Sequence, residues 1–253
     1  MYLSYPAILA LPELPWVTAL AGLVFFLNQK HALHLTHFTM HIKELIQACY
    51  NGSSEMVNQF SNAVITFLFN IILMRLAGPN GVAAITILLY GQFLFNAFYL
   101  GFSIGISPIV GYQYGAGNRK ELKRIYRISF RFVSISSVII AFAAVYLSSG
   151  IVTIFTDDPK THALAVTGFG IFAYNFLFSG FNIASSGFFT ALSDGKSSAI
   201  ISFCRTLLFT VISLLVLPRF FGVNGAWLAI PVAEFVTLLL SIWMHRKYLY
   251  RFI

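Results

Sequence analysis

Long apolar runs, separated by short polar turns, dominate this chain. A helix needs about 20 apolar residues to cross the roughly 30 Å hydrocarbon core of a bilayer, and six runs reach about that length. They are Met56–Met74, Val82 to beyond Pro108, Phe132–Thr156, Thr161–Ser193, Ser197–Leu217 and Asn224–Met244. The intervening turns are Gly78-Pro79-Asn80-Gly81, Asn118, Asp157-Asp158-Pro159, Asp194-Gly195-Lys196 and Pro218-Arg219. The pattern predicts an all-α polytopic membrane protein with a six-helix transmembrane bundle.

The first fifty residues differ from the rest. The apolar stretch Pro6–Asn28 contains three prolines and Glu13, and its most regular part, Val17–Leu27, is too short to cross a bilayer. A signal peptide is disfavoured because neither Lys nor Arg precedes the stretch. We expect a partial apolar segment and an amphipathic linker over residues 1–50, and the bundle over residues 51–253.

Composition supports lipid as the solvent. Hydrophobic residues make up 58% of the chain and charged residues 9%, whereas soluble domains carry roughly 25% charged residues. A soluble enzyme is therefore excluded. The net charge of +8 does not indicate nucleic-acid binding, because the basic residues lie between apolar runs. The two cysteines form no motif, and nothing in the pattern predicts a metal or an organic cofactor.

The distribution of Lys and Arg predicts the orientation in the membrane. If the helices alternate, most basic residues lie on one side, which the positive-inside rule assigns to the cytoplasm. That side holds Lys30, Lys43, the run Arg119–Arg131, and Arg246, Lys247 and Arg251. We expect a cell-membrane protein in which both ends of the six-helix bundle face the cytoplasm, and in which the basic run enters the membrane past anionic lipid headgroups.

Several short motifs resemble the multidrug and toxic compound extrusion (MATE) family, in particular its MepA-like branch. The motifs are Gly52–Ser54 (GSS), Thr66–Asn70 (TFLFN), Ala77–Ala84 (AGPNGVAA), Gly101–Asn118 (GFSIGISPIVGYQYGAGN), Ser186–Leu192 (SGFFTAL) and Trp227–Glu234 (WLAIPVAE). Together they extend over about Asn51 to Lys247. Any one of them is a weak signal, whereas their combination is specific.

The resemblance implies a fold and a function. Such transporters have twelve helices in two lobes, with a substrate cleft between the lobes, and they exchange H⁺ or Na⁺ for organic cations or other amphipathic compounds. This chain resembles the second lobe, with residues 1–50 matching the end of the sixth helix and the inter-lobe linker. The resemblance thus predicts half of a secondary active multidrug exporter, which needs a first lobe or a second copy of this chain.

Other functions remain open at this stage. The chain is also compatible with a non-transporting truncated membrane fragment. A lipid-linked precursor flippase of the same superfamily is a further alternative, although such proteins need a more cationic cavity and the only basic residue well inside the apolar runs is Arg205. A seven-helix receptor is disfavoured by the motifs.

Two charged residues lie inside the predicted spans. Glu234 lies about 15 Å from the outer end of the last span, and Arg205 lies about 12 Å from the cytoplasmic start of the preceding antiparallel span, at 1.5 Å per residue. Ionisable groups are costly in hydrocarbon, so we expect the two side chains to face inward and pair. Both a static ion pair and a carboxylate that binds the coupling ion fit this pattern.

Other polar residues are candidates for lining a cleft. Glu55 follows a predicted helix start, where a carboxylate also suits the helix dipole. Asn58, Asn62 and Thr66 recur every fourth residue and so share one face, which fits either cross-helix hydrogen bonds or a cleft. Gln92, Asn96 and Asn182 complete this set. Asn62 and Asn182 stand near positions that are acidic in the Na⁺-coupled branch of the family, so the resemblance disfavours a Na⁺ site of that kind.

Four histidines form a cluster near residue 35: His31, His34, His37 and His41. The last three share one helical face with spacing compatible with metal ligation, but an interfacial amphipathic linker is the more ordinary explanation, so no metal site is predicted. Gly105, Pro108 and Pro231 lie inside predicted spans and are candidate hinges, because proline removes a backbone hydrogen bond. Pro231 precedes Glu234 by three residues.

Overall fold

The fold is described from a computed structural model of the chain. The structure describes residues 19, 20, 23, 25 and 42–248, with side chains from residue 60 onward and at the isolated positions 19, 20, 23, 25 and 42. The chain divides into two compact units, Met1–Asn51 and Gly52–Ile253. The described residues of the first unit are helical, and the architecture below concerns the second.

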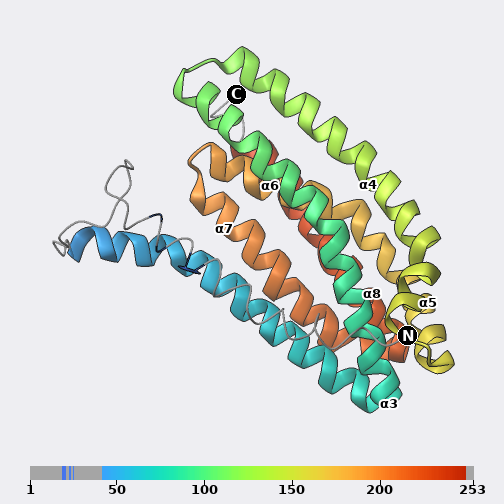
Figure 1. The fold of residues 1–253 in the computed structure, drawn as a ribbon. Helices are drawn as coiled ribbons and strands as arrows, with labels where there is room; N and C mark the ends of the chain where they lie inside the picture. Colours follow the sequence, from blue (N-terminus) through green and yellow to red (C-terminus); the bar gives the residue numbers. More distant parts are fainter. Residues whose placement is uncertain (1–18, 21–22, 24, 26–41, 249–253) are drawn as a thin grey trace. The chain divides into compact units, whose positions relative to one another are not determined.

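Every regular element among the described residues is a helix. The helices are α3 (Ile42–Gly115), α4 (Arg119–Phe155), α5 (Pro159–Phe172), the 3₁₀ turn η1 (Ala173–Asn175), α6 (Phe176–Ala191), α7 (Gly195–Phe203), the π-helical segment η2 (Cys204–Leu208) and α8 (Phe209–Tyr248). Within the part of the chain that the structure describes, four continuous stretches are long and apolar enough to cross a membrane: Phe60–Gly115, Arg119–Phe155, Pro159–Ala191 and Gly195–Tyr248. Their arrangement is shown in Figure 1.

Two of these stretches are each interrupted by a glycine. Gly78 in α3 has φ 64° and ψ −156°, and Gly222 in α8 has φ 55° and ψ −132°. A side chain at such a positive φ is strained, whereas glycine adopts it readily. Both glycines begin a Gly-x-Asn-Gly sequence. Two helices meet at each of them, and the chain bends back at these points (Figure 1).

The second break differs from the sequence prediction. The fifth span was predicted to end at Leu217, before Pro218, but Pro218 lies inside the helix and the break comes at Gly222. The proline is tolerated because neighbouring helices and local adjustment satisfy the freed backbone carbonyl in membrane helices. The first break lies at the predicted turn, Gly78-Pro79-Asn80-Gly81.

Short polar side chains cap three of the helix starts. Asn118 accepts a hydrogen bond from the Glu121 backbone N–H (3.2 Å) at the start of α4, so the basic run occupies the first turns of that helix. Asp158 caps α5, accepting from the Thr161 N–H (2.8 Å), and Pro159 occupies the first turn. Asp194 caps α7 in the same way. The charged turns therefore both interrupt the apolar runs and start the next helix.

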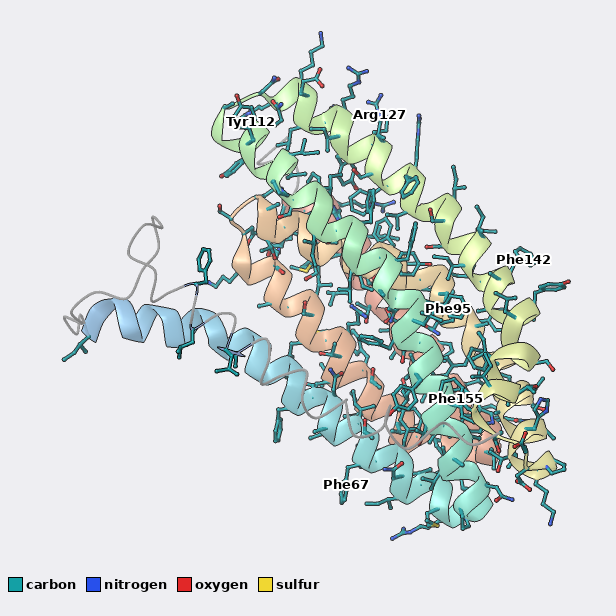
Figure 2. All side chains as sticks on the ribbon, in the orientation of Figure 1. Phe67, Phe95, Tyr112, Arg127, Phe142 and Phe155 are labelled. Carbon is teal, nitrogen blue, oxygen red and sulfur yellow. The ribbon has the colours of Figure 1, made fainter. Side chains whose placement is uncertain are left out.

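The interior and the outer surface of the helical unit are both apolar. Large buried side chains include Phe69, Phe169 and Trp227 in one cluster and Tyr99 and Phe176 in another. The outer side of α4 is equally apolar, with Phe142 73% and Tyr146 87% exposed, and Figure 2 shows side chains such as Phe142 and Phe67 projecting outward. Exposed apolar surface of this extent marks contact with lipid or a partner rather than water. The chain is a multi-pass membrane protein.

Candidate functional site

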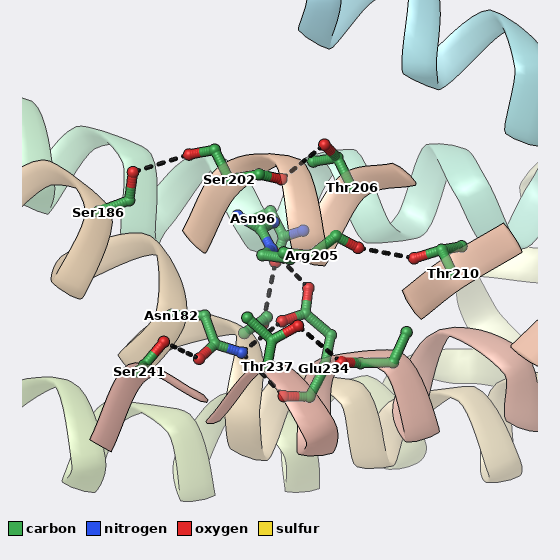
Figure 3. Close-up of polar contacts among 12 residues, drawn as sticks. Asn96, Asn182, Ser186, Ser202, Arg205, Thr206, Thr210, Glu234, Thr237 and Ser241 are labelled. Carbon is green, nitrogen blue, oxygen red and sulfur yellow. Dashed lines mark hydrogen bonds and ion pairs between the residues drawn. The ribbon is translucent and has the colours of Figure 1, made fainter. Parts of the chain in front are cut away.

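The two charged residues predicted to pair do so deep in the helical unit. Glu234 on α8 is buried, and its Oε1 accepts a hydrogen bond from Arg205 Nε at 2.7 Å (Figure 3). The carboxylate side chain is 4% exposed and the arginine side chain 18% exposed. An isolated charge at this depth would be strongly unfavourable, so each residue makes the other tolerable. The arginine also retains access to the outside of the unit.

A third residue binds the same carboxylate. Asn182 on α6 is fully buried, and its Nδ2 donates to Glu234 Oε2 at 2.8 Å and to the Glu234 backbone carbonyl at 2.9 Å. Ser241 Oγ in turn donates to Asn182 Oδ1 at 3.0 Å, which holds the amide in this orientation. The carboxylate thus has one oxygen on Arg205 and the other on Asn182. Both of its oxygens are hydrogen-bonded in this state.

The backbone around Arg205 is unusual. Arg205 lies in η2, the π-helical segment, between two α-helical parts of the same span. Thr210 Oγ1 donates to the Arg205 carbonyl at 2.7 Å, and Thr206 Oγ1 donates to the Ser202 carbonyl at the same distance (Figure 3). Short π-helical segments inside α-helices are frequent at functional sites. The pattern of apolar residues gives no sign of this π-helical segment. Its one feature in the sequence is the pair Thr206 and Thr210, whose hydroxyls bond backbone carbonyls there.

The polar residues of the second span lie at a different contact. Asn96, half-buried on α3, accepts a hydrogen bond at its Oδ1 from Ser179 Oγ on α6 at 3.3 Å. Gln92 is also half-buried, one turn earlier on the same helix. Asn96 therefore joins α3 to α6 on the helix that carries Asn182. It is not among the residues that bind the carboxylate.

The remaining candidates do not join the Glu234 cluster. Asn62 and Thr66 are exposed on α3, so these two do not pack inside the unit. The side chains of Glu55 and Asn58, and the predicted histidine cluster, lie outside the described part of the chain. Among the described residues, no group of three His, Cys, Asp or Glu side chains is placed to hold a metal ion.

The predicted hinge residues lie within continuous helix. The non-helical backbone in α3 is at Gly78 and not at Gly105 or Pro108, and in α8 it is at Gly222 and not at Pro231. Gly105 and Pro108 are exposed, and Pro231 is buried. The backbone dihedral angles at these three positions are helical, and a hinge role for them remains a prediction.

Comparison with known proteins identifies the family. The MatE family profile matches residues 56–215, which is more than half of the chain. No curated protein matches the sequence. Among solved structures, one described as an inward-facing conformation of a multidrug resistance MATE family transporter of the MOP superfamily superposes with a TM-score of 0.81 at 18% identity, covering 91% of this chain and 54% of that one.

Two other solved structures are similar. A MATE in complex with MaL6 gives a TM-score of 0.79 at 18% identity, over 93% of this chain and 54% of that one. A MOP superfamily transporter from Pyrococcus furiosus, described as having a binding pocket of reverse polarity that suggests a different function, gives 0.77 at 18% identity, over 91% and 53%. The chain spans about half the length of these proteins. It shares their fold over nearly its whole length, and it belongs to the MATE family.

Proposed function

We propose that this chain forms one six-helix lobe of a secondary active exporter that moves organic cations or other amphipathic compounds out of the cell against H⁺ or Na⁺. The family match and the coverage of about half of each solved transporter support one lobe. The apolar stretches support six crossings. Phe60–Gly115 and Gly195–Tyr248 contain 56 and 54 residues, or about 80 Å of straight helix each, more than twice the hydrocarbon thickness. Breaks at Gly78 and Gly222 turn each into two crossings.

The observation that carries this proposal is the buried cluster of Glu234, Arg205 and Asn182. In the proposed cycle, a proton bonds to a carboxylate oxygen of Glu234, or a Na⁺ binds beside it, and the carboxylate then no longer needs Arg205. The released guanidinium, which is the more exposed partner, is free to turn toward the cleft. Asn182 holds the second carboxylate oxygen throughout, because its amide bonds Oε2 rather than Oε1.

Coupling requires that the paired and released states differ in packing. Arg205 lies in the π-helical segment, a single wider turn that contains one extra residue. The helix can change its local conformation there by converting this turn to a regular α-helical one. Pro231 lies one turn before Glu234 and leaves a carbonyl without its usual helical donor. We therefore place the responsive elements at η2 and in the first turns of α8 beyond Gly222, both next to the carboxylate.

The proposal also includes the environment and partners. The lobe lies in the cell membrane, with the basic start of α4 and the basic last turn of α8 on the cytoplasmic side, as expected from the positive-inside rule. A first lobe completes the cleft, whether it belongs to the same polypeptide, a separate chain or a second copy. Exposed Asn62 and Thr66 are candidates for the cleft face, together with half-buried Gln92 and Asn96. The proposal also assigns the chain to the MepA-like branch, on the short motifs that the sequence carries.

An efflux assay tests the proposal. The chain is expressed in a strain without efflux pumps, alone and together with a candidate first lobe, and efflux of a fluorescent organic cation is measured with and without a proton or Na⁺ gradient. We expect Glu234→Gln to abolish gradient-driven efflux while the protein still inserts. Glu121→Gln, which changes an exposed carboxylate paired loosely with Arg124 at 3.8 Å, is the matched control. Normal efflux by Glu234→Gln would exclude the proposed coupling role.

A further inference from the structure

A groove along the first half of α4 combines basic and apolar side chains. It has a volume of about 440 Å³ and is lined by Tyr126, Arg127, Phe130, Arg131, Ser134 and Ile135. None of its lining residues belongs to the Glu234 cluster, and no step of the proposed transport cycle involves them. Figure 2 shows the Arg127 side chain at the outer edge of α4.

The groove carries uncompensated positive charge. Arg127 and Arg131 are exposed and stand four residues apart, so they lie on the same face of α4, one turn from each other. The acidic side chain in the first turn of this helix, Glu121, pairs with Arg124. Among the described residues, no carboxylate forms an ion pair with Arg127 or Arg131. Two neighbouring guanidinium groups suit a phosphate group, which accepts several N–H donors at once.

The position of these arginines in the helix matches the depth of lipid headgroups. Arg131 is the last charged residue before the uncharged run Phe132–Thr156. Toward the membrane interior the same face continues as Ile135 (63% exposed), Ile139 (61%) and Phe142 (73%). These residues follow at helical spacing, so they form an apolar track directly below the charged groove. A ligand with an anionic head and an acyl chain fits both parts.

The floor of the groove is rigid. The rings of Tyr126 and Phe130 lie 4.5 Å apart, and both pack against the buried ring of His245 at 5.4 and 5.1 Å. His245 is itself fixed by a 2.9 Å hydrogen bond to Ser185 on α6. Aromatic contacts at these separations are favourable. The groove is therefore largely formed before a ligand arrives, which lowers the entropic cost of binding.

We infer that this groove binds the headgroup of an anionic phospholipid, with Arg127 and Arg131 on the phosphate and an acyl chain along Ile135, Ile139 and Phe142. The apolar track distinguishes a lipid from free phosphate, since a soluble anion gains nothing from it. The uncompensated charge distinguishes an anionic lipid from a zwitterionic one. This inference is independent of the transport proposal.

Native mass spectrometry of the detergent-purified full chain tests the inference. Phosphatidylglycerol and phosphatidylcholine with the same acyl chains are titrated, and binding is compared between the wild type, Arg127→Gln/Arg131→Gln, and the control Arg119→Gln/Lys120→Gln. The control removes the same charge from the exposed first turn of α4, outside the groove. We expect the groove variant to bind phosphatidylglycerol about thirtyfold more weakly, since each basic side chain near an anionic headgroup contributes about fivefold. The control should retain nearly the wild-type affinity.

Three results would contradict the inferred lipid site. Equal weakening by both double variants would mean diffuse attraction by the basic end of α4. Equal affinity for phosphatidylcholine would remove the anionic specificity. Displacement of bound phosphatidylglycerol by millimolar glycerol 3-phosphate would mean that the groove binds a soluble phosphate. A further variant, Ile135→Asn, should weaken lipid binding although all the charges remain, because it interrupts the apolar track.

Discussion

At the scale of single residues, one carboxylate determines how the site is built. Glu234 is buried, and Arg205 and Asn182 each supply a hydrogen-bond donor to one of its two carboxylate oxygens. A buried ion pair is not by itself evidence of stability, since the cost of desolvating both charges often cancels their attraction. The presence of a carboxylate in an apolar span suggests a function for the charge. The carboxylate and its arginine form the centre of the proposed coupling site.

The contact between Glu234 and Arg205 was predictable, whereas its details were not. Counting 1.5 Å per residue from the two ends of the membrane placed both residues at nearly the same depth, and the energetic cost of charge in lipid then required a partner. Asn182 was predicted as a residue of a cleft and as the neutral counterpart of an acidic position in the Na⁺-coupled branch, but not as a partner of Glu234. Its hydrogen bond to Glu234 depends on the rotation of α6 about its own axis relative to α8. The spacing of apolar residues along one helix does not determine that rotation.

Removal of one partner should be worse than removal of both. Arg205→Leu leaves a buried carboxylate with only Asn182, and we expect a loss of roughly 3 kcal/mol in stability. Arg205→Leu/Glu234→Leu should recover most of that loss, because no uncompensated charge remains. Thermal unfolding in detergent of the wild type, Arg205→Leu, Glu234→Leu and the double variant measures the difference. A double variant as unstable as the sum of the single variants would show that the two residues act independently.

At the scale of helices, caps and glycine turns set the boundaries. Charged and polar turns predicted most helix ends correctly because the residues that cannot stay in lipid are also good helix caps. The exception was Pro218, which was expected to end a span. The actual break uses the positive φ of Gly222 four residues later. The π-helical segment η2 was not predictable, because a single inserted residue hardly changes the apolar pattern of so hydrophobic a span.

The cap of α5 should give a small acid sensitivity. Hydrogen bonds from the backbone N–H and the side chain of Thr161 lower the pKa of Asp158 from its ordinary value of 3.8. A lowered folded-state pKa means that the stabilisation is fully present above the ordinary value and is lost as the pH falls through the folded pKa. Asp158→Asn keeps the oxygen that caps the helix but should lose this pH dependence. Unfolding temperatures measured between pH 2 and 6 compare the two proteins, and identical acid sensitivity would contradict the assignment.

Close packing at the second glycine turn makes another prediction. A Cβ on Gly225 would overlap the backbone carbonyl of Leu217 and lie 2.8 Å from Pro218 N. Backbone atoms there cannot rotate away, so Gly225→Ala should cost about 1–3 kcal/mol. Gly170→Ala, where a Cβ meets no atom within 4 Å, is the control and should be neutral or slightly stabilising. Equal unfolding temperatures for the two variants would show that the turn at Gly222 is looser than described.

At the scale of the whole molecule, the surface of the unit makes sense only with lipid around it. Apolar side chains cover α4 outside and fill the interior, and the matched transporters are about twice as long as this chain. The sequence alone predicted the helical membrane fold because hydrophobicity determines it. It did not predict which face of each helix lies inside the unit and which lies outside, since both are apolar.

Six crossings predict a specific pattern of accessibility. Single cysteines at Asn118, Asp157, Asp194 and Asn224, in a background without Cys49 and Cys204, are labelled in intact cells with a membrane-impermeant maleimide. Positions 157 and 224 should react from outside, and positions 118 and 194 only after the cells are opened. Reaction of position 224 from the same side as 194 would mean that Gly195–Tyr248 does not cross twice.

The central claim is that Glu234 binds the coupling cation when it is released from Arg205. Its most direct test is made in proteoliposomes that contain the chain with its first lobe, where an imposed gradient of an organic cation drives counter-movement of H⁺ or Na⁺, followed with a pH-sensitive dye or radioactive Na⁺. We predict cation movement with the wild-type chain and none with Glu234→Gln, although the variant still binds the organic cation. Cation movement by Glu234→Gln at the wild-type rate would contradict the account.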